Sequence, residues 1–298
     1  MKIIDTHIHL WDLEKNHYPW LVEPITHFAG DFSSLAKSYL IGDLHSDASD
    51  VDLHKCVHIQ AEFDHDQDPV IETAWLQSVA DNPTSRGMPH GIVAYADLAA
   101  PDVENTLARH VEHSNMRGIR QMLNYEEDPA LRFTDHDHLM NDSDWQRGFR
   151  LLGKYNLSFD LQIWPWQLEE AAQLAKKIPD VPIVLNHTGM PKDLDLSRMD
   201  QWKSGLQSLA EAPQVTVKIS ALPMMDKDWT VEKIKPFVLG TIEIMGVDRC
   251  MFASNFPVDK IMTSYSRLWG AYDEIVKDLS EEERASLFWK NAEHYYRI

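Results

Sequence analysis

Cysteine is scarce in this sequence of 298 residues, which contains only Cys56 and Cys250. Two cysteines cannot build a disulfide framework or an all-cysteine zinc site. Each of them lies in an apolar run typical of a strand, and a free cysteine behaves as a small buried hydrophobe. We therefore expect two buried free thiols.

Long apolar runs are missing as well. No stretch approaches the ~20 apolar residues that span a bilayer. The N-terminal residues MKIIDTH lack the charged and then apolar pattern of a signal peptide. These absences predict a cytoplasmic protein without a membrane partner.

Basic residues are few relative to acidic ones, 28 against 47, which gives a formal charge of −19. A field of this sign repels phosphate backbones and anionic membranes, so we expect no nucleic-acid partner. The hydrophobic share of 44% and the charged share of 25% are those of an ordinary globular protein, which excludes a disordered chain.

Short apolar runs alternate with amphipathic helical patterns along almost the whole chain. Apolar residues in 69–81, for example, recur with the period of a helix, and Ser280 with Glu283 forms a capping box before the last helical pattern. Eight strands that alternate with helices predict an α/β fold, a (β/α)8 TIM-like barrel in one domain over residues 1–298. The predicted strands are 3–8, 55–61, 90–96, 118–123, 157–163, 181–186, 215–220 and 249–253.

The connection between the first two strands is unusually long, from about Trp11 to Asp52. A long loop after the first strand of a barrel can cover the active face. Trp20 of this loop, together with Trp11 and Trp164, can form an apolar or sugar-stacking wall. Packing in the core is the competing interpretation for these aromatic side chains.

Several predicted strands carry polar residues at alternate positions. Because helices cover the outside of such a barrel, these polar positions should face the interior or its mouth. Burying many of them is costly unless they form a site or a satisfied polar network, and we favour a site. The predicted inward set is Asp5, His7, His9, His58, Gln60, Glu62, Arg120, Asp160, Gln162, Lys218 and Ser220, with His187 and Asn255 at strand ends.

The tripeptide His7-Ile8-His9 is the sharpest local signal. Two histidines at i and i+2 on a strand share a face and can reach one metal ion or one substrate oxygen. Asp5 can accept a ring N–H from such a histidine, as carboxylates beside metal sites do. A pair of satisfied interior histidines is the alternative.

The segment Asp5-Thr6-His7-Ile8-His9-Leu10-Trp11 resembles the opening of the amidohydrolase superfamily, in the lactonase branch that acts on sugar-acid and pyrone-dicarboxylate-type lactones. The resemblance covers nearly the whole chain. It implies a TIM-like barrel that hydrolyses an ester, lactone or amide at the C-terminal face. The other matching segments are Ile59-Gln60-Ala61-Glu62, Gly118-Ile119-Arg120, Phe159-Asp160-Leu161-Gln162, Asn186-His187-Thr188-Gly189-Met190-Pro191 and Phe252-Ala253-Ser254-Asn255-Phe256-Pro257.

The resemblance also implies roles for three histidines. His7, His9 and His187 match the family's metal-binding or carbonyl-polarising histidines, and some superfamily members use one or two divalent metals, commonly zinc. Some lactonases of this branch work without a metal and bind substrate directly through histidines and arginines. We therefore expect at most one divalent metal on these histidines, with zinc the first candidate and a metal-independent site the alternative.

The chain departs from the family pattern at Asn255, where members usually have an aspartate that acts as general base and often as metal ligand. An amide cannot take a proton from water near neutral pH, although its oxygen can accept a hydrogen bond. The base is then unassigned, with Asp259 and a histidine as candidates. No clear match to a bridging carboxylate or lysine is present, which argues against a two-metal site.

Polar residues on other strands are candidates for substrate binding. Arg120 can pair with a substrate carboxylate through two parallel hydrogen bonds, or it can form an ion pair with Asp160 or Glu62. The candidates for binding hydroxyl groups or the lactone oxygen are Gln60, Gln162 and Lys218.

These features predict a hydrolase of carbohydrate metabolism that opens a small polyhydroxylated or carboxylated lactone by attack of water on the ring carbonyl. The predicted catalytic residues are His7, His9, His187 and Asn255. The alternatives are a metal-dependent decarboxylase related to the amidohydrolases and a barrel that binds a ligand without catalysis. The expected partner is a small lactone or acid, and the sequence is compatible with a homo-oligomer.

Overall fold

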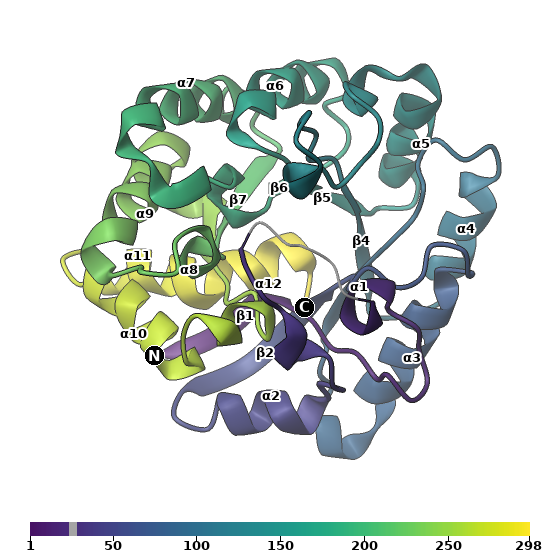
Figure 1. Ribbon diagram of the computed structural model, residues 1–298, viewed down its shortest axis with the longest axis horizontal. Helices are drawn as coiled ribbons and strands as arrows, with labels where there is room; N and C mark the ends of the chain where they lie inside the picture. Colours follow the sequence, from purple (N-terminus) through teal and green to yellow (C-terminus); the bar gives the residue numbers. More distant parts are fainter. Residues whose placement is uncertain (24–28) are drawn as a thin grey trace.

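Eight parallel strands form the centre of the structure, a computed structural model that describes residues 1–23 and 29–298 (Figure 1). Each strand pairs with the next one along the chain. This order, with helices between the strands, confirms the predicted (β/α)8 TIM-like barrel. The strands are β1 (Lys2–Ile8), β2 (Asp52–Ile59), β3 (Gly91–Ala94), β4 (Met116–Met122), β5 (Ser158–Gln162), β6 (Ile183–Leu185), β7 (Val215–Ile219) and β8 (Cys250–Phe252).

Helices surround the sheet on its outer side (Figure 1). In α5, the carboxylate of Asp142 accepts the first backbone N–H groups, which starts the helix. Trp145 and Phe149 of α5 then pack edge-on against Phe159 of β5, with ring centroids 5.5 and 5.3 Å away. The helices are α1 (Pro19–Val22), α2 (Ile41–Asp47), α3 (Val70–Asp81), α4 (Val103–His110), α5 (Ser143–Lys154), α6 (Leu168–Lys177), α7 (Met199–Ala210), α8 (Leu222–Met225), α9 (Val231–Met245), α10 (Tyr265–Ile275), α11 (Glu281–Ala285) and α12 (Asn291–Tyr296).

The barrel closes between β1 and β8 through residues at the ends of the two strands. The backbone N–H of Asn255 donates to the carbonyl of His7 (2.8 Å), and the N–H of His9 donates to the carbonyl of Phe256 (2.7 Å). The segments that carry three of the predicted site residues are therefore fixed to one another by main-chain hydrogen bonds.

One extra residue in β1 decides which of its side chains face inward. Asp5 pairs with Cys56 and Ile8 with His58, so three steps along β1 correspond to two along β2, as in a β-bulge. Asp5 consequently faces outward, where the hydroxyl of Tyr265 on α10 donates to its carboxylate (2.8 Å). The prediction that Asp5 shares the inward face of the histidines and accepts a ring N–H is wrong.

A cluster of mostly aliphatic side chains fills part of the barrel interior below the site. In β2 the inward residues are the valine and isoleucine positions, whereas His58 faces α3, with Nε2 3.8 Å from the Glu72 carboxylate. The predicted inward orientation of His58 is wrong, because a buried carboxylate on the covering helix provides its polar environment. The interior cluster consists of Val57, Ile59, Val93, Val184, Met251 and Tyr296.

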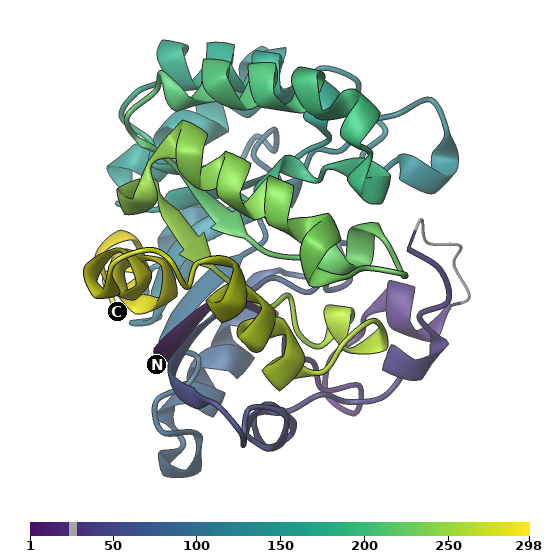
Figure 2. The ribbon, with the colours of Figure 1, turned by 90° about the vertical axis from the view of Figure 1, so that its left-hand side faces the viewer.

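The long connection between β1 and β2 contains α1, a 3-10 turn at Ser33–Leu35 and α2. Figure 2 shows α1 and that turn in purple, on the same side of the barrel as α8 and the segment after β8, and opposite the two termini. This is the side on which the strands end, so the connection helps to cover the C-terminal face. Among the described helices, none is a candidate for a membrane span.

Candidate active site

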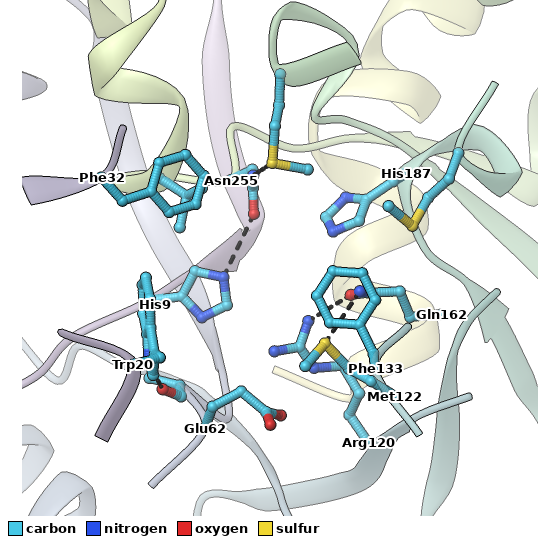
Figure 3. Close-up of a pocket in the computed structure, with 14 residues that line it drawn as sticks. His9, Trp20, Phe32, Glu62, Arg120, Met122, Phe133, Gln162, His187 and Asn255 are labelled. Atoms are coloured by element: carbon cyan, nitrogen blue, oxygen red, sulfur yellow. Dashed lines mark hydrogen bonds between the residues drawn. The ribbon is translucent and has the colours of Figure 1, made fainter. Parts of the chain in front are cut away.

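A cavity of about 250 Å³ lies at the C-terminal ends of the strands (Figure 3). Trp20 and Phe32 from the long first connection and Phe133 from the segment after β4 give it apolar walls. Pockets for drug-sized ligands are roughly 300–1,000 Å³, so this one suits a small molecule. The polar residues that line it are His9, Glu62, Arg120, Gln162, His187 and Asn255.

Three histidine rings come together at this cavity. The ring centroid of His7 lies 5.0 Å from that of His9 and 4.5 Å from that of His187. His9 and His187 line the cavity, whereas His7 is fully buried beside them. Neither ring nitrogen of His7 has a hydrogen-bond partner within residues 1–23 and 29–298. Since a buried polar group without a partner is costly, His7 is placed to receive one from a ligand or water.

The surroundings favour the neutral form of all three rings. Burial lowers the pKa of His7, His9 and His187 well below the usual histidine value, and the positive charge of Arg120 contributes in each case. Lys218 adds to the effect at His7 and His187. A neutral imidazole offers one N–H donor and one acceptor nitrogen, so the cluster can hold a substrate oxygen or a water molecule from several sides.

Hydrogen bonds to backbone and side chain orient two of these rings. Nδ1 of His9 lies 2.8 Å from the carbonyl oxygen of Ile59 and must carry a proton, because a carbonyl only accepts. Nδ1 of His187 lies 2.9 Å from the hydroxyl of Ser220, which follows β7. Each ring therefore directs Nε2 away from its anchor.

His9, Asn255 and Asp259 form a hydrogen-bonded chain. Nε2 of His9 lies 3.3 Å from Oδ1 of Asn255, and Nδ2 of that amide donates to Asp259 (2.8 Å). This arrangement needs a doubly protonated His9, whereas Asp259 can accept the amide N–H in either protonation state. With the amide turned over, a neutral His9 and a protonated Asp259 satisfy the same chain. Burial lowers the pKa of His9 and raises that of Asp259 well above its usual value, which favours the second arrangement.

Asp259 is thus a partner of Asn255. It is fully buried and is not among the residues that line the cavity. Its raised pKa and its hydrogen bond to Asn255 suit a residue that holds the amide in place. It is poorly suited to the role of general base, for which the sequence offered it as a candidate.

Arg120 reaches the cavity from β4. One Nη atom donates to Oε1 of Gln162 (2.8 Å) and the other to the backbone carbonyl of Gln60 (2.6 Å). The Nε–H of this buried guanidinium has no hydrogen-bond partner in the part of the chain that the structure describes. Arg120 and Gln162 therefore line the cavity as one hydrogen-bonded unit with donor capacity left over.

Lys218 lies in the barrel interior and does not line the cavity. Its ammonium donates to Asp160 (2.5 Å), and both side chains are fully buried. Tyr296 and Asn186 donate to the same carboxylate, at 2.9 and 3.1 Å. Burial lowers the pKa of Lys218 to about 8. Asp160 is thus the partner of Lys218, not of Arg120.

Two of the three predicted wall tryptophans are not part of the lining. Trp20 lines the cavity, and Trp11 packs behind it with ring centroids 5.5 Å apart. Trp164 is buried against Trp166, with centroids 5.5 Å apart and an N–H bond to the carbonyl of Leu131 (2.8 Å). Core packing, the competing interpretation, thus describes Trp11 and Trp164.

Glu62 lines the cavity although it lies beyond the end of β2. Its φ of 55° is in the left-handed region and breaks the alternation of the strand at this point. The buried Gln60 side chain fixes it twice: Nε2 donates to the Glu62 carboxylate, and Oε1 accepts the Glu62 backbone N–H (2.6 Å). Gln60 is therefore a support of Glu62 behind the lining, and sequence alternation carries no information about such a turn.

Left-handed backbone recurs where other strands end. His187 has a φ of 56°, Ala221 of 55° and Asn255 of 61°. Residues other than glycine adopt this conformation rarely, at a cost of order 1–3 kcal/mol that is often found at functional sites. Two of these three residues line the cavity, as Glu62 does.

Known proteins resemble this chain over almost its whole length. A family model described as amidohydrolase matches residues 4–298. The chain belongs to the amidohydrolase family. This amidohydrolase is 46% identical to an uncharacterized protein of Sinorhizobium fredii, over 99% of this chain and 98% of that one. It is also 26% identical to an L-fucono-1,5-lactonase of Burkholderia multivorans, over 99% of this chain and 96% of the lactonase. The family and these relatives show that the present chain is a hydrolase.

A solved structure has the same fold. The crystal structure of an amidohydrolase from Burkholderia multivorans with bound zinc superposes with a TM-score of 0.82 at 24% identity, covering 100% of both chains. At this identity the likeness concerns the barrel itself. Whether this chain can hold a metal has to be judged from its own side chains.

The histidine cluster does not fit a tightly held divalent metal. No group of three or more His, Cys, Asp or Glu side chains in residues 1–23 and 29–298 is arranged to hold an ion. The nearest candidates are the three neutral histidines, and the residue opposite His9 is an amide, Asn255. Arg120 and Lys218 add positive charge at the cluster, and this charge disfavours the binding of a metal cation.

Proposed function

We propose that this amidohydrolase opens a small lactone of the sugar-acid type, polyhydroxylated or carboxylated. Water adds to the ring carbonyl carbon, the ring C–O bond breaks, and the product is the open hydroxy acid. The similarity to an L-fucono-1,5-lactonase supports this substrate class. The cavity is small, and its apolar walls face a polar floor. These features fit a compact ring that carries hydroxyl or carboxylate groups.

One observation carries the proposal: buried polar atoms without partners belong to residues that line the cavity or lie directly beside it. Both ring nitrogens of His7 and the Nε–H of Arg120 lack partners among the described residues. Donors held in place before the reaction stabilise the negative charge that develops on a carbonyl oxygen. Arg120 and His187 can supply such donors at the space in which that oxygen would lie, His9 lines the same space, and Gln162 is placed to bind a substituent of the ring.

We further propose that this chemistry needs no tightly bound metal. Many zinc sites include a carboxylate or thiolate ligand, and here the amide of Asn255 stands beside the histidines instead. If zinc entered, His7, His9 and His187 would be its ligands, and it would polarise the carbonyl as Lewis acid. The hydrogen-bond donors of the chain itself, above all Arg120, are placed to polarise the carbonyl without a metal.

The zinc content of two proteins tests this view. Wild-type protein dialysed against zinc-free buffer should contain well below one zinc per chain by elemental analysis. In the exchange variant N255D/D259N, a carboxylate faces His9 while the hydrogen bond between the two positions is kept with donor and acceptor swapped. This variant should retain more zinc. One zinc per wild-type chain that resists a chelator would show that the amide is an adequate ligand.

The function itself is tested with a set of lactones. Purified protein should release acid from at least one sugar-acid or dicarboxylate lactone with saturation kinetics, measured by a pH indicator. The same protein is given aromatic acids, and carbon dioxide is measured. Decarboxylation without lactone opening would replace the proposal by the decarboxylase alternative. Tight binding of a lactone without turnover would favour a non-catalytic barrel.

Other expectations from the sequence stay predictions. These are a cytoplasmic location, assembly into a homo-oligomer, a role in carbohydrate metabolism and the absence of nucleic-acid or membrane partners. The small cavity supports a small-molecule partner.

A further inference from the structure

The proposed reaction lacks one participant, a group that takes a proton from the attacking water. Asn255 cannot do so, because an amide is not a base near neutral pH. Asp259 is buried away from the cavity lining and bound to Asn255. Nδ1 of His9 is committed to the carbonyl of Ile59, and its Nε2 faces the amide of Asn255. With His187 and His7 assigned above to the carbonyl oxygen, the attacking water needs another base.

We infer that Glu62 is the general base of the lactone hydrolysis proposed above, on which this inference rests. Among the described residues that line the cavity, Glu62 alone carries a carboxylate. Figure 3 shows this carboxylate pointing into the cavity, near Arg120 and on the same side as His9. About a quarter of its side chain, 26%, is exposed, so water reaches it.

The position of the Glu62 carboxylate is fixed by its surroundings. Gln60 donates to one carboxylate oxygen and accepts the backbone N–H of Glu62 (2.6 Å). The other oxygen lies 3.5 Å from Nε2 of His65, whose ring stacks on Tyr95 with centroids 3.9 Å apart. Together with the strained φ of 55°, these contacts hold an acid at the cavity rim, as catalysis requires.

The proton balance of the step is simple. The water oxygen bonds to the carbonyl carbon as one water proton passes to the Glu62 carboxylate, and the carbonyl oxygen becomes an oxyanion beside Arg120 and the histidines. When the intermediate collapses, the ring C–O bond breaks and the leaving ring oxygen takes the proton back from Glu62. Lactone and water thus become a hydroxy acid, and the enzyme is restored.

The pH dependence of the reaction should report this carboxylate. A general base acts only in its deprotonated form, so the pH–rate profile of the reaction is a readout of the group that takes the proton. Glu62 lines two neighbouring cavities. The charged and titratable groups that share them are His9, Arg120 and His187 in one, and His65, Tyr95, Asp97, His136, Asp142 and Asp144 in the other.

Glu62→Gln tests the inference on a lactone that wild-type enzyme hydrolyses. The variant keeps size and hydrogen bonding but not basicity, so kcat should fall by ~10²–10⁴-fold with little change in KM. The acid limb of the pH–rate profile should vanish. Glu62→Asp, which keeps a carboxylate, should recover part of the rate. The control is Glu274→Gln, at an exposed position on α10, which should behave as wild type.

Each outcome decides between the two proposals. A Glu62→Gln enzyme within about threefold of the wild-type kcat, or one with raised KM and unchanged kcat, would overturn the base assignment and leave lactone hydrolysis standing. If wild-type protein opens no lactone, the proposed function fails, and the role of Glu62 fails with it. Circular dichroism of each variant shows whether a lost rate comes from unfolding.

Discussion

Replacing Arg120 by methionine is expected to lower kcat/KM for lactone hydrolysis by about 10²–10³-fold, the usual cost of removing one donor to a developing oxyanion. Methionine preserves the buried stem but removes the guanidinium, whose Nε–H has no partner among the described residues. Arg120→Lys should be nearly as poor, because lysine restores a charge without the planar set of donors. Steady-state kinetics on the best lactone measures both effects.

A matched control separates this effect from a general loss of arginine. Arg150 is exposed on α5, and Arg150→Met should keep the wild-type rate and stability. Arg120→Met leaves Gln162 and the Gln60 carbonyl without a donor, so a modest loss of stability is expected as well. If Arg120→Met had wild-type kinetics, a residue other than Arg120 would have to bind the substrate oxygen.

The second large effect is expected on stability. Asp160→Asn should lower the free energy of unfolding at pH 7 by ~3–5 kcal/mol, because it leaves the buried Lys218 without its counter-charge. The surface pair of Lys154 and Glu104 provides the control, since both side chains are at least half exposed. Glu104→Gln should change the stability by less than ~0.5 kcal/mol. Urea unfolding measures both.

The loss in Asp160→Asn should also depend on pH. Burial lowers the pKa of Lys218 to about 8 in the wild-type protein, and removing the carboxylate lowers it further. The unfolded chain then binds this proton more tightly than the folded one, so stability rises with pH toward the free lysine pKa of about 10.4. The deficit should shrink as the pH rises toward about 8 and level off above it, because Lys218 is then neutral in both folded proteins. A constant deficit would show that lost hydrogen bonds, not charge, are responsible.

Where the strands are regular, their alternation predicted which side chains face the interior of the barrel. Arg120, Gln162 and Lys218 all lie inside the barrel or at its mouth, because β4, β5 and β7 keep a period of two. The same rule misplaced His58 and Asp5. For His58 the deciding contact is Glu72, far away in sequence, and for Asp5 it is a bulge that shifts the phase of β1. Neither feature leaves a local signal.

The upper part of the site was harder to predict than its floor. Phe32 and Phe133, which form walls of the cavity, come from two connections between strands, and no periodicity identifies them. The sequence identified Glu62 as a polar residue that faces inward, but its place in the cavity depends on a left-handed turn that the sequence does not show. The structure brings the histidines and Asn255, which the family resemblance singled out, close together, and their catalytic roles stay predictions.

The hydroxyl of Tyr296 gives the charge pair at the centre of the barrel a partner from α12, beyond all eight strands. A ribosome that has finished β8 still has to add α10, α11 and α12 before that hydroxyl is available. At roughly 5–20 residues per second, the nascent sheet waits several seconds with Asp160 and Lys218 incompletely satisfied and its lower end open. The polar centre of the barrel is therefore completed only by a helix that is made after all eight strands.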